Sequence, residues 1–248
     1  MYVESPPGHP AVTVAAPAKL TLSLRVVGVR PDGFHLIEAE MVSLDLADTL
    51  SFGPGDGLEV TETTTGLRVP VTDDNLVRRA LAVVGRTAHV RLVKRIPAGG
   101  GLGGGSADAA AVLRWAGVAD LVTAASVGAD VPFCLRGGRA RVTGIGEVLD
   151  PLPPVEATYT LVVPPFGCAT PAVYRAWDAM GGPTGAGPND LEPAALRVEP
   201  RLAEWRDRLG RATGETPVLA GSGSTWFVPG AHPGDGRIMV RATPPLLV

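Results

Sequence analysis

Apolar and polar residues alternate strictly along residues 19–26, near the start of the chain. One face carries leucine and valine, and the other carries Lys19 and Thr21 among its polar residues. A period of two is typical of a strand with one buried face, so the pattern predicts a half-buried β-strand. The alternation recurs at residues 42–46 and predicts a second strand. Lys19 and Thr21 therefore project together from one face.

Helical periodicity begins directly after a glycine-rich run. Apolar residues at positions 109, 112, 113 and 116 follow the spacing of one helix face. Ser106 is the expected N-cap of this helix, and Gly117 is its expected stop. Asn75 is the expected cap of an earlier helix. Later in the chain, Thr170 and Pro171 have the chemistry of an N-cap and a first helical residue.

The second half of the chain mixes strand and helix patterns, as the first half does. Proline-rich residues 151–154 are the expected linker, which places a domain boundary after residue 152. We therefore expect an N-terminal domain of residues 1–152 and a C-terminal domain of residues 153–248. Intermixed strands and helices in both indicate an α+β protein of two layers. Further strands are expected at residues 139–149 (bulged at its glycines), 158–163, 218–220, 226–228 and 237–242, and a helix at 202–209.

Six glycines occupy seven consecutive positions between residues 99 and 105, interrupted only by Leu102. Glycine reaches positive φ at little cost, so successive backbone N–H groups can turn inward as a concave nest. The helix that follows adds unpaired N–H groups and the positive end of its dipole. This combination predicts a cradle for an anion, most often a phosphate.

Several motif types compete for this glycine run. A Walker A loop is excluded, because no lysine follows the glycines. Gly99, Gly101 and Gly104 satisfy the dinucleotide pattern G-x-G-x-x-G, but three basic residues in the preceding segment are unlike a strand buried on both faces. A flexible linker fits poorly, because Pro97 and Leu102 interrupt the run and a well-patterned helix follows.

Composition and charge limit the kinds of binding partner and the cellular compartment that we expect for this protein. The net charge of −3 and the lack of a basic run argue against a nucleic-acid partner or a membrane surface, so we expect a small-molecule ligand. Cys134 and Cys168 lack metal-type spacing. The first ten residues have neither a basic nor an apolar run, so we expect a cytoplasmic protein with reduced thiols. Nothing in the sequence predicts an oligomeric state.

The glycine run resembles the P-x-G-x-G-L-G-[GS]-S-[SA] loop of the GHMP kinases, named for galactose, homoserine, mevalonate and phosphomevalonate. Four further stretches occur in the order and approximate spacing of one branch of that family. They are Ala16-Pro17-Ala18-Lys19-Leu20-Thr21, Arg30-Pro31-Asp32-Gly33-Phe34-His35, Gly128-Ala129-Asp130-Val131-Pro132 and Gly221-Ser222-Gly223-Ser224-Thr225. Five short motifs in one order are much stronger evidence than any one alone.

The resemblance implies the two-domain GHMP kinase fold, with mixed and antiparallel sheets, and an ATP-dependent kinase. This branch transfers the γ-phosphoryl group to the C2 hydroxyl of a cytidine diphosphate-linked methylerythritol, in non-mevalonate isoprenoid biosynthesis. An alcohol is a poor nucleophile, so the reaction needs a base and a cation beside it. By resemblance these are Asp130 and Lys19. From the residues alone, a turn-capping Asp130 and a solvated Lys19 remain open.

The remaining binding residues are also implied by the resemblance. Ser106 is expected to help hold Mg²⁺ between the phosphates, and Asp108 is expected to be an ordinary acidic residue of the first helical turn. The nucleotide would contact Pro97, Ala98, Gly99, Gly100, Gly101, Leu102, Gly103, Gly104, Gly105, Ser106 and Ala107. The substrate would contact Thr21, Phe34, His35, Tyr174, Gly221, Ser222 and Gly223, of which the aromatic side chains would stack on cytosine and His35 would read its edge.

The chain departs from the family pattern in three ways. Phe34 stands where tyrosine is usual, Thr21 stands where asparagine is common, and the chain is shorter than typical members. Two other functions therefore stay open: a GHMP kinase for another alcohol, such as mevalonate or homoserine, and a nucleotide-binding regulatory protein without turnover. The Asp-Gly-Phe-His segment argues against the first, and the presence of both Lys19 and Asp130 argues against the second.

Overall fold

A computed structural model describes residues 12–63, 71–185 and 187–246 of the chain. In this part of the chain runs of strands and runs of helices are intermixed, as expected for an α+β protein. The elements are β1 (Val12–Val29), β2 (His35–Gly53), β3 (Gly57–Glu62), α1 (Leu76–Val83), β4 (His89–Lys94), α2 (Gly104–Trp115), α3 (Leu121–Val127), α4 (Val131–Arg136), β5 (Arg139–Thr143), β6 (Val148–Pro151), β7 (Thr158–Val162), α5 (Thr170–Ala179), α6 (Glu192–Val198), α7 (Leu202–Thr213), β8 (Val218–Leu219), β9 (Trp226–Pro229) and β10 (Arg237–Arg241).

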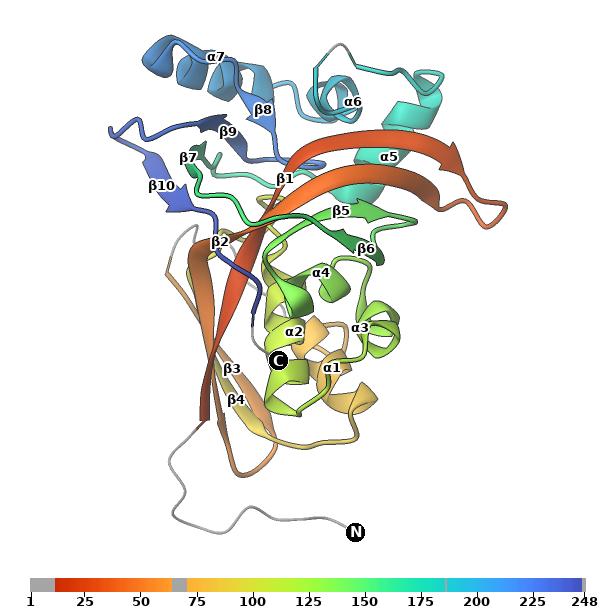
Figure 1. Ribbon diagram of the computed structural model, residues 1–248, viewed down its shortest axis with the longest axis vertical. Coiled ribbons are helices and arrows are strands. Elements are labelled where there is room, and N and C mark those ends of the chain that lie inside the picture. Colours follow the sequence, from red (N-terminus) through yellow and green to blue (C-terminus); the bar gives the residue numbers. More distant parts are fainter. Residues whose placement is uncertain (1–11, 64–70, 186, 247–248) are drawn as a thin grey trace.

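A six-stranded sheet forms the first half of the molecule. Its order is β3-β4-β2-β5-β6, and β1 pairs with β2. All pairs are antiparallel except β3 with β4. Helices α1 to α4 gather on one face of this sheet, where α2 packs against β1 (Figure 1). The buried alanines of α2 allow this close approach, and the sheet and helices share one apolar core.

A four-stranded antiparallel sheet, ordered β10-β7-β9-β8, forms the second half. Mixed and antiparallel sheets in the two halves agree with the predicted fold class. Residues 152–157 join the two sheets, and the domain division after residue 152 stays a prediction.

The long β1–β2 hairpin spans both halves of the molecule. Its upper end arches over α5 (Figure 1). There Leu24, Ile37 and Met41 belong to the same buried cluster as Trp177 and Trp226 from the second half. The hairpin therefore gives both halves a common wall, and the site lies along it.

The segment after β10 returns to the first half of the molecule (Figure 1). The Thr243 N–H donates to the Ser43 carbonyl at 2.9 Å, and the Leu246 N–H donates to the Arg136 carbonyl at 2.9 Å. We call residues 242–246 the return segment. It lies against the C-terminal end of α4, a short helix that begins directly after Asp130.

Three local predictions are corrected by the structure. Ser106 is not the N-cap of α2: Gly103 takes that position in a left-handed conformation, because the loop turns there. Thr170 is the first residue of α5, after Ala169 as its cap. Residues 139–149 form a hairpin rather than one bulged strand, because the glycines at 144 and 146 make the turn with positive φ. The predicted cap is confirmed at Asn75, whose side chain accepts from the Val77 N–H.

Candidate active site

A cavity of about 640 Å³ lies between the glycine run, β1, the start of α4 and the turn after β8. Most of the residues predicted from the sequence line it. They are Lys19, Thr21, Pro97 to Ser106 without a gap, Asp130, Tyr174, Gly221 and Ser222. Phe34, His35, Ala107 and Gly223 are not among its lining residues.

The glycine run is shaped by contacts that exclude side chains. Gly99, Gly101 and Gly103 have φ of +72°, +77° and +70°, a region that L-residues with a Cβ rarely enter. A Cβ on Gly103 would lie 2.7 Å from Lys19 Cγ. The Lys19 N–H donates to the Leu102 carbonyl at 3.0 Å, and the Leu102 side chain is buried. The run is thus a fixed loop that ends at the N-terminus of α2.

Lys19 and Asp130 meet at the cavity although 111 positions separate them in the sequence. Lys19 Nζ lies 3.5 Å from Asp130 Oδ2. The Lys19 side chain is 7% exposed and that of Asp130 is 33% exposed, so the lysine is not a solvated surface residue. Asp130 precedes α4, but its side chain makes no capping hydrogen bond. The Asp130 carboxylate therefore does not cap the helix, which was the structural alternative that its position in the sequence left open.

Thr21 holds the other side of the lysine ammonium. Lys19 Nζ donates to Thr21 Oγ1 at 3.1 Å, and Thr21 is buried. Residues 17–23 contain two register shifts between β1 and β2. Such bulges re-aim side chains, and here Lys19 and Thr21, from the predicted polar face, point inward to the cavity.

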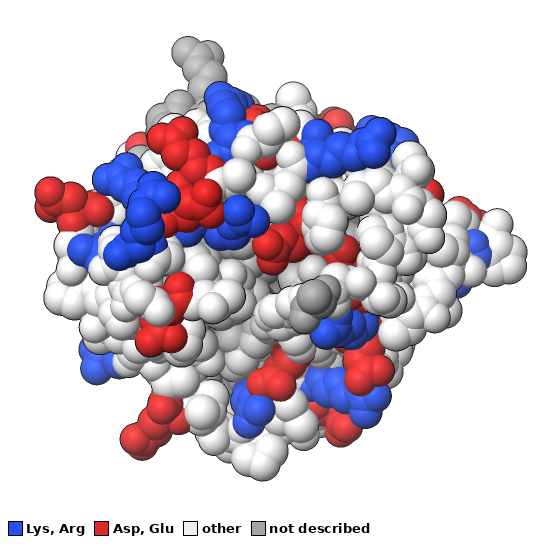
Figure 2. All heavy atoms as spheres, turned by 90° about the horizontal axis from the view of Figure 1, so that it is seen from above, with Lys and Arg blue, Asp and Glu red and all other residues white. Residues whose placement is uncertain are grey.

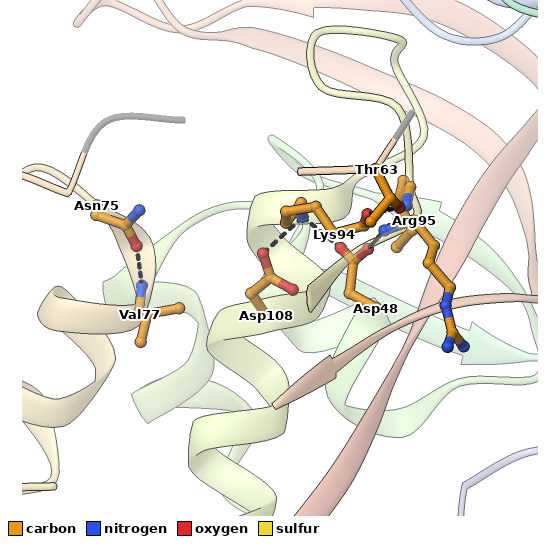
Figure 3. A network of polar contacts seen from close by, with 8 residues as sticks. Asp48, Thr63, Asn75, Val77, Lys94, Arg95 and Asp108 are labelled. Carbon is orange, nitrogen blue, oxygen red and sulfur yellow. Dashed lines mark hydrogen bonds and ion pairs between the residues drawn. The ribbon is translucent and has the colours of Figure 1, made fainter. Parts of the chain in front are cut away.

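A buried charge cluster lies under the glycine run, and sequence analysis missed it (Figure 3). Lys94 Nζ donates to Asp48 and, at 2.7 Å, to Asp108 Oδ2. Asp48 also accepts from the backbone N–H groups of Arg95 and Ile96, at 2.5 and 2.8 Å. The cluster ties β2, the end of β4 and α2 together at the two ends of the glycine run.

Two carboxylates share one ammonium in this cluster. Burial opposes the charged form of Lys94, but Asp108 and Asp48 outweigh it and raise the lysine pKa. Burial raises the pKa of Asp108 to about 8, and Asp48 adds to the rise against the opposing effect of Lys94. Asp108 Oδ1 is buried without a partner among the described residues. The expectation of an ordinary first-turn acidic residue is therefore wrong, because Asp108 lies one turn further and faces inward.

An aromatic group, made of His35, Tyr174 and Trp177, lies near the tip of the β1–β2 hairpin. The rings of His35 and Tyr174 are 4.5 Å apart at 31°, and Trp177 meets His35 edge-on. His35 Nε2 lies 2.8 Å from Asp178 Oδ1. Burial raises the pKa of Tyr174, and the Asp130 charge adds to this. His35 and Tyr174 thus lie against each other, whereas Phe34 is 56% exposed and Asp178 was not foreseen.

The turn after β8 interlocks with the glycine run. The Thr225 N–H donates to the Gly100 carbonyl at 3.1 Å. A Cβ on Gly101 would lie 2.6 Å from the Ala220 carbonyl oxygen. On the other side of the turn, Ser222 Oγ lies 2.7 Å from Thr170 Oγ1 at the start of α5. The turn therefore closes the cavity from the second half of the molecule.

Charges of both signs are mixed on the face of the molecule that is seen from above (Figure 2). Lys and Arg alternate with Asp and Glu over the face seen in Figure 2, and neither sign gathers into one patch. Among the described residues, no helix has both the length and the apolar character needed to cross a bilayer. The described residues also contain no group of three or more His, Cys, Asp or Glu side chains that could hold a metal ion.

Comparison with known proteins connects this geometry to a family. A family profile described as the N-terminal domain of GHMP kinases matches residues 75–138. A 4-diphosphocytidyl-2-C-methyl-D-erythritol kinase of Paracoccus denitrificans is 39% identical over 235 residues, which cover 86% of this chain and 85% of the relative. A relative of the same name from Cereibacter sphaeroides is 37% identical over 241 residues, covering 86% and 87%.

Solved structures are similar over nearly the whole chain. A crystal structure of 4-(cytidine 5'-diphospho)-2C-methyl-D-erythritol kinase aligns with a TM-score of 0.70 and 33% identity, covering 94% of this chain and 100% of the other. A homoserine kinase from Cytophaga hutchinsonii aligns with a TM-score of 0.61 at 18% identity, covering 99% and 98%. The second similarity concerns the fold alone.

Proposed function

Because the chain belongs to the 4-diphosphocytidyl-2-C-methyl-D-erythritol kinases of the GHMP family, we propose that the Lys19–Asp130 pair carries its phosphoryl transfer. The chain is an ATP-dependent small-molecule kinase of non-mevalonate isoprenoid biosynthesis. The acceptor in this proposal is the C2 hydroxyl of the methylerythritol unit. The observation that supports these roles is the 3.5 Å approach of Lys19 to Asp130 beside the glycine run.

In the proposed reaction, Asp130 takes the proton of the acceptor hydroxyl as that oxygen attacks the γ-phosphorus of ATP. A base within hydrogen-bond reach contributes typically 10²–10⁴-fold to such a step. Lys19 orients the carboxylate and offsets charge that develops on the phosphoryl oxygens. Thr21 holds the ammonium in that position through its hydroxyl.

The glycine run fits the triphosphate of ATP. A Cβ on Gly103 would collide with Lys19, whereas the run is open toward the cavity. α2 begins within the run, at Gly104, without a side-chain cap. Backbone N–H groups at a helix N-terminus suit an anion. Residues 97–107 would hold the phosphates, and the Ser106 hydroxyl would help hold Mg²⁺. The ion supplies positive charge to the β- and γ-phosphates when bound.

The cytidine end of the substrate is assigned to the aromatic group. Tyr174 and His35 offer flat surfaces and a ring nitrogen next to the cavity, and stacking on an aromatic ring contributes on the order of 1–3 kcal/mol per base. Phe34 is exposed beside them and would cover the base once it is bound. Gly221, Ser222 and Gly223 would contact the transferring phosphate or the diphosphate.

The test is ADP release with ATP and the cytidyl substrate. Asp130→Asn is expected to lower kcat at least about 100-fold, while the Kd for an ATP analogue stays close to that of the wild type. Glu59→Gln is the matched control, because Glu59 is an exposed carboxylate paired with His89 and Arg91, and none of the three lines the cavity. A kcat for Asp130→Asn within about tenfold of the wild type would refute the assigned base.

The same assay separates the other functions. Turnover of mevalonate or homoserine in place of the cytidyl substrate would identify a GHMP kinase for another alcohol. Binding of the ATP analogue without turnover of any of these alcohols would identify a regulatory relative.

A further inference from the structure

Asn189 is a buried amide that the proposed reaction leaves without a role. Its side chain makes three hydrogen bonds, and each uses a different direction of the amide. Nδ2 donates to the Leu219 carbonyl at 2.8 Å and to the Gly221 carbonyl at 2.7 Å. Oδ1 accepts from the Leu191 N–H at 2.9 Å. Both donors of the amide are thus used by the end of β8 and the turn that follows it, which closes the cavity.

The segment around Asn189 is itself fastened to β1. The Leu24 N–H donates to the Pro188 carbonyl at 2.8 Å, and the Asp190 N–H donates to the Leu24 carbonyl at 2.9 Å. The buried Asp190 carboxylate accepts from the Val26 N–H at 3.0 Å and from Arg25 at 2.6 Å. β1 is the strand that carries Lys19 and Thr21. The lysine and the turn are therefore held by the same strand, the lysine directly and the turn through Asn189.

The turn lies directly over the lysine. A Cβ on Gly221 would be 3.7 Å from both Lys19 Nζ and Thr21 Oγ1. The bond between Gly221 and Ser222 is a trans peptide, so its C=O and N–H point in opposite directions. The C=O points at Asn189, and the N–H of Ser222 therefore points away from Asn189. In the described part of the chain this N–H has no acceptor.

We propose that Asn189 is a positioning residue that fixes the Gly221–Ser222 peptide with its N–H directed to the cavity beside Lys19. The inference rests on the proposed function and deepens it. A peptide in this orientation presents a donor to an anionic oxygen near the lysine. The reverse orientation would place the Gly221 carbonyl oxygen there and repel the phosphate.

Asn189→Asp is the sharpest variant. It keeps the shape of the side chain and the acceptor for Leu191, but it replaces both donors with an oxygen that faces two carbonyls. We expect kcat to fall at least about tenfold, in line with the loss of one donor to a developing oxyanion. The Kd for an ATP analogue should stay within about threefold, because the glycine run does not contact Asn189.

Asp190→Asn is the matched comparator. It weakens the same segment at the neighbouring position without touching the turn carbonyls, so it reports what mere loosening does. We expect a lower Tm with kcat within about threefold of the wild type. If the two variants lose kcat and Tm in parallel, Asn189 has only a structural role and the proposal is wrong.

A crystal structure of Asn189→Asp decides the question without activity. The expected result is a Gly221–Ser222 peptide turned over relative to the wild type; an unchanged peptide would overturn the proposal. A wild-type protein that fails to turn over the cytidyl substrate would count against the proposed function, and the peptide orientation would still be measured.

Discussion

Gly103 is the residue where the loop, the helix and the lysine come closest. Its φ of +70° and the 2.7 Å between a Cβ there and Lys19 Cγ leave room for hydrogen only. Gly103→Ala is therefore expected to move Lys19 and to lower kcat by at least about tenfold, since small misplacements of catalytic groups cost up to about 100-fold. The measurement is steady-state ADP release.

Gly117→Ala is the control variant that measures the effect of backbone strain alone. This residue has a similar φ of +74°, but a Cβ there meets nothing within 4 Å. Gly117→Ala should cost about 1–2 kcal/mol of stability and leave kcat unchanged. Equal losses of kcat in the two variants would show that strain, rather than the contact with Lys19, limits the reaction.

The Lys94 cluster makes a second prediction about single residues. Lys94→Met leaves the buried carboxylates of Asp48 and Asp108 without their cation, and breaking a buried pair costs about 3–5 kcal/mol. Urea unfolding measures this loss. Arg91→Met is the control, because its ion pair with Glu59 is exposed and such pairs contribute about 0–1 kcal/mol. A Lys94→Met protein as stable as the control would contradict this account of the cluster.

The sequence indicates the two charged residues at the cavity more readily than the buried residues that hold the cavity in shape. Lys19 and Asp130 were found because the order of short motifs implied them. Asp48, Lys94 and Asp108 are widely separated, and isolated charged residues are usually exposed, so no periodicity marks them as one buried cluster. The hydrogen bonds of Asn189 join segments that are distant in sequence, so they depend on tertiary structure.

The N-termini of α2 and α3 differ in whether a side chain accepts their first N–H groups. α3 begins with a side-chain cap, in which Asp120 accepts from the Thr123 N–H at 2.8 Å and from its hydroxyl at 2.7 Å. α2 begins on the glycine run without one. The start of α3 is therefore closed by a side chain, whereas α2 leaves its first N–H groups open to the cavity.

The α3 cap predicts a pH dependence of stability. Hydrogen bonds from the Thr123 side chain and backbone lower the pKa of Asp120 below its ordinary 3.8. Its contribution is therefore fully present above that value and is lost as the pH falls through the lower folded pKa. Asp120→Asn keeps an acceptor oxygen that does not titrate, so its Tm should fall less than that of the wild type between about pH 4 and pH 2. Parallel Tm curves would rule out this contribution.

Elements with strong periodicity were predicted, and elements defined by their neighbours were not. The alternation in β1 and the helical spacing in α2 and α7 are confirmed. α6 was missed because seven residues give less than two full turns of pattern. The sequence of the β5–β6 hairpin predicts one strand, because its turn glycines are also typical of a bulge.

At the scale of the whole molecule, the return segment joins the two halves. Besides two backbone hydrogen bonds, Pro245 and Leu246 lie against Gly138 and Gly137, where a Cβ would meet them within 3 Å. Deleting residues 243–248 removes these contacts. At about 1 kcal/mol for each hydrogen bond, we expect a Tm lower by roughly 4–8 °C.

Leu246→Asp separates the two contributions that the deletion removes together. It keeps the backbone hydrogen bonds of the return segment and disrupts only the apolar contact of Leu246. Differential scanning calorimetry should show a smaller decrease for the substitution than for the deletion. An unchanged Tm in both variants would mean that the return segment adds nothing to the first half.

The return segment also fixes an order of events during translation. α4, which follows the proposed base, is synthesised about a hundred residues before Leu246 reaches it. A nascent chain can build the sheet and the glycine run early, whereas the contact between the return segment and α4 forms only after residues 242–246 have been synthesised. The support that residues 242–246 give to α4 is therefore added after the scaffold that carries the proposed base.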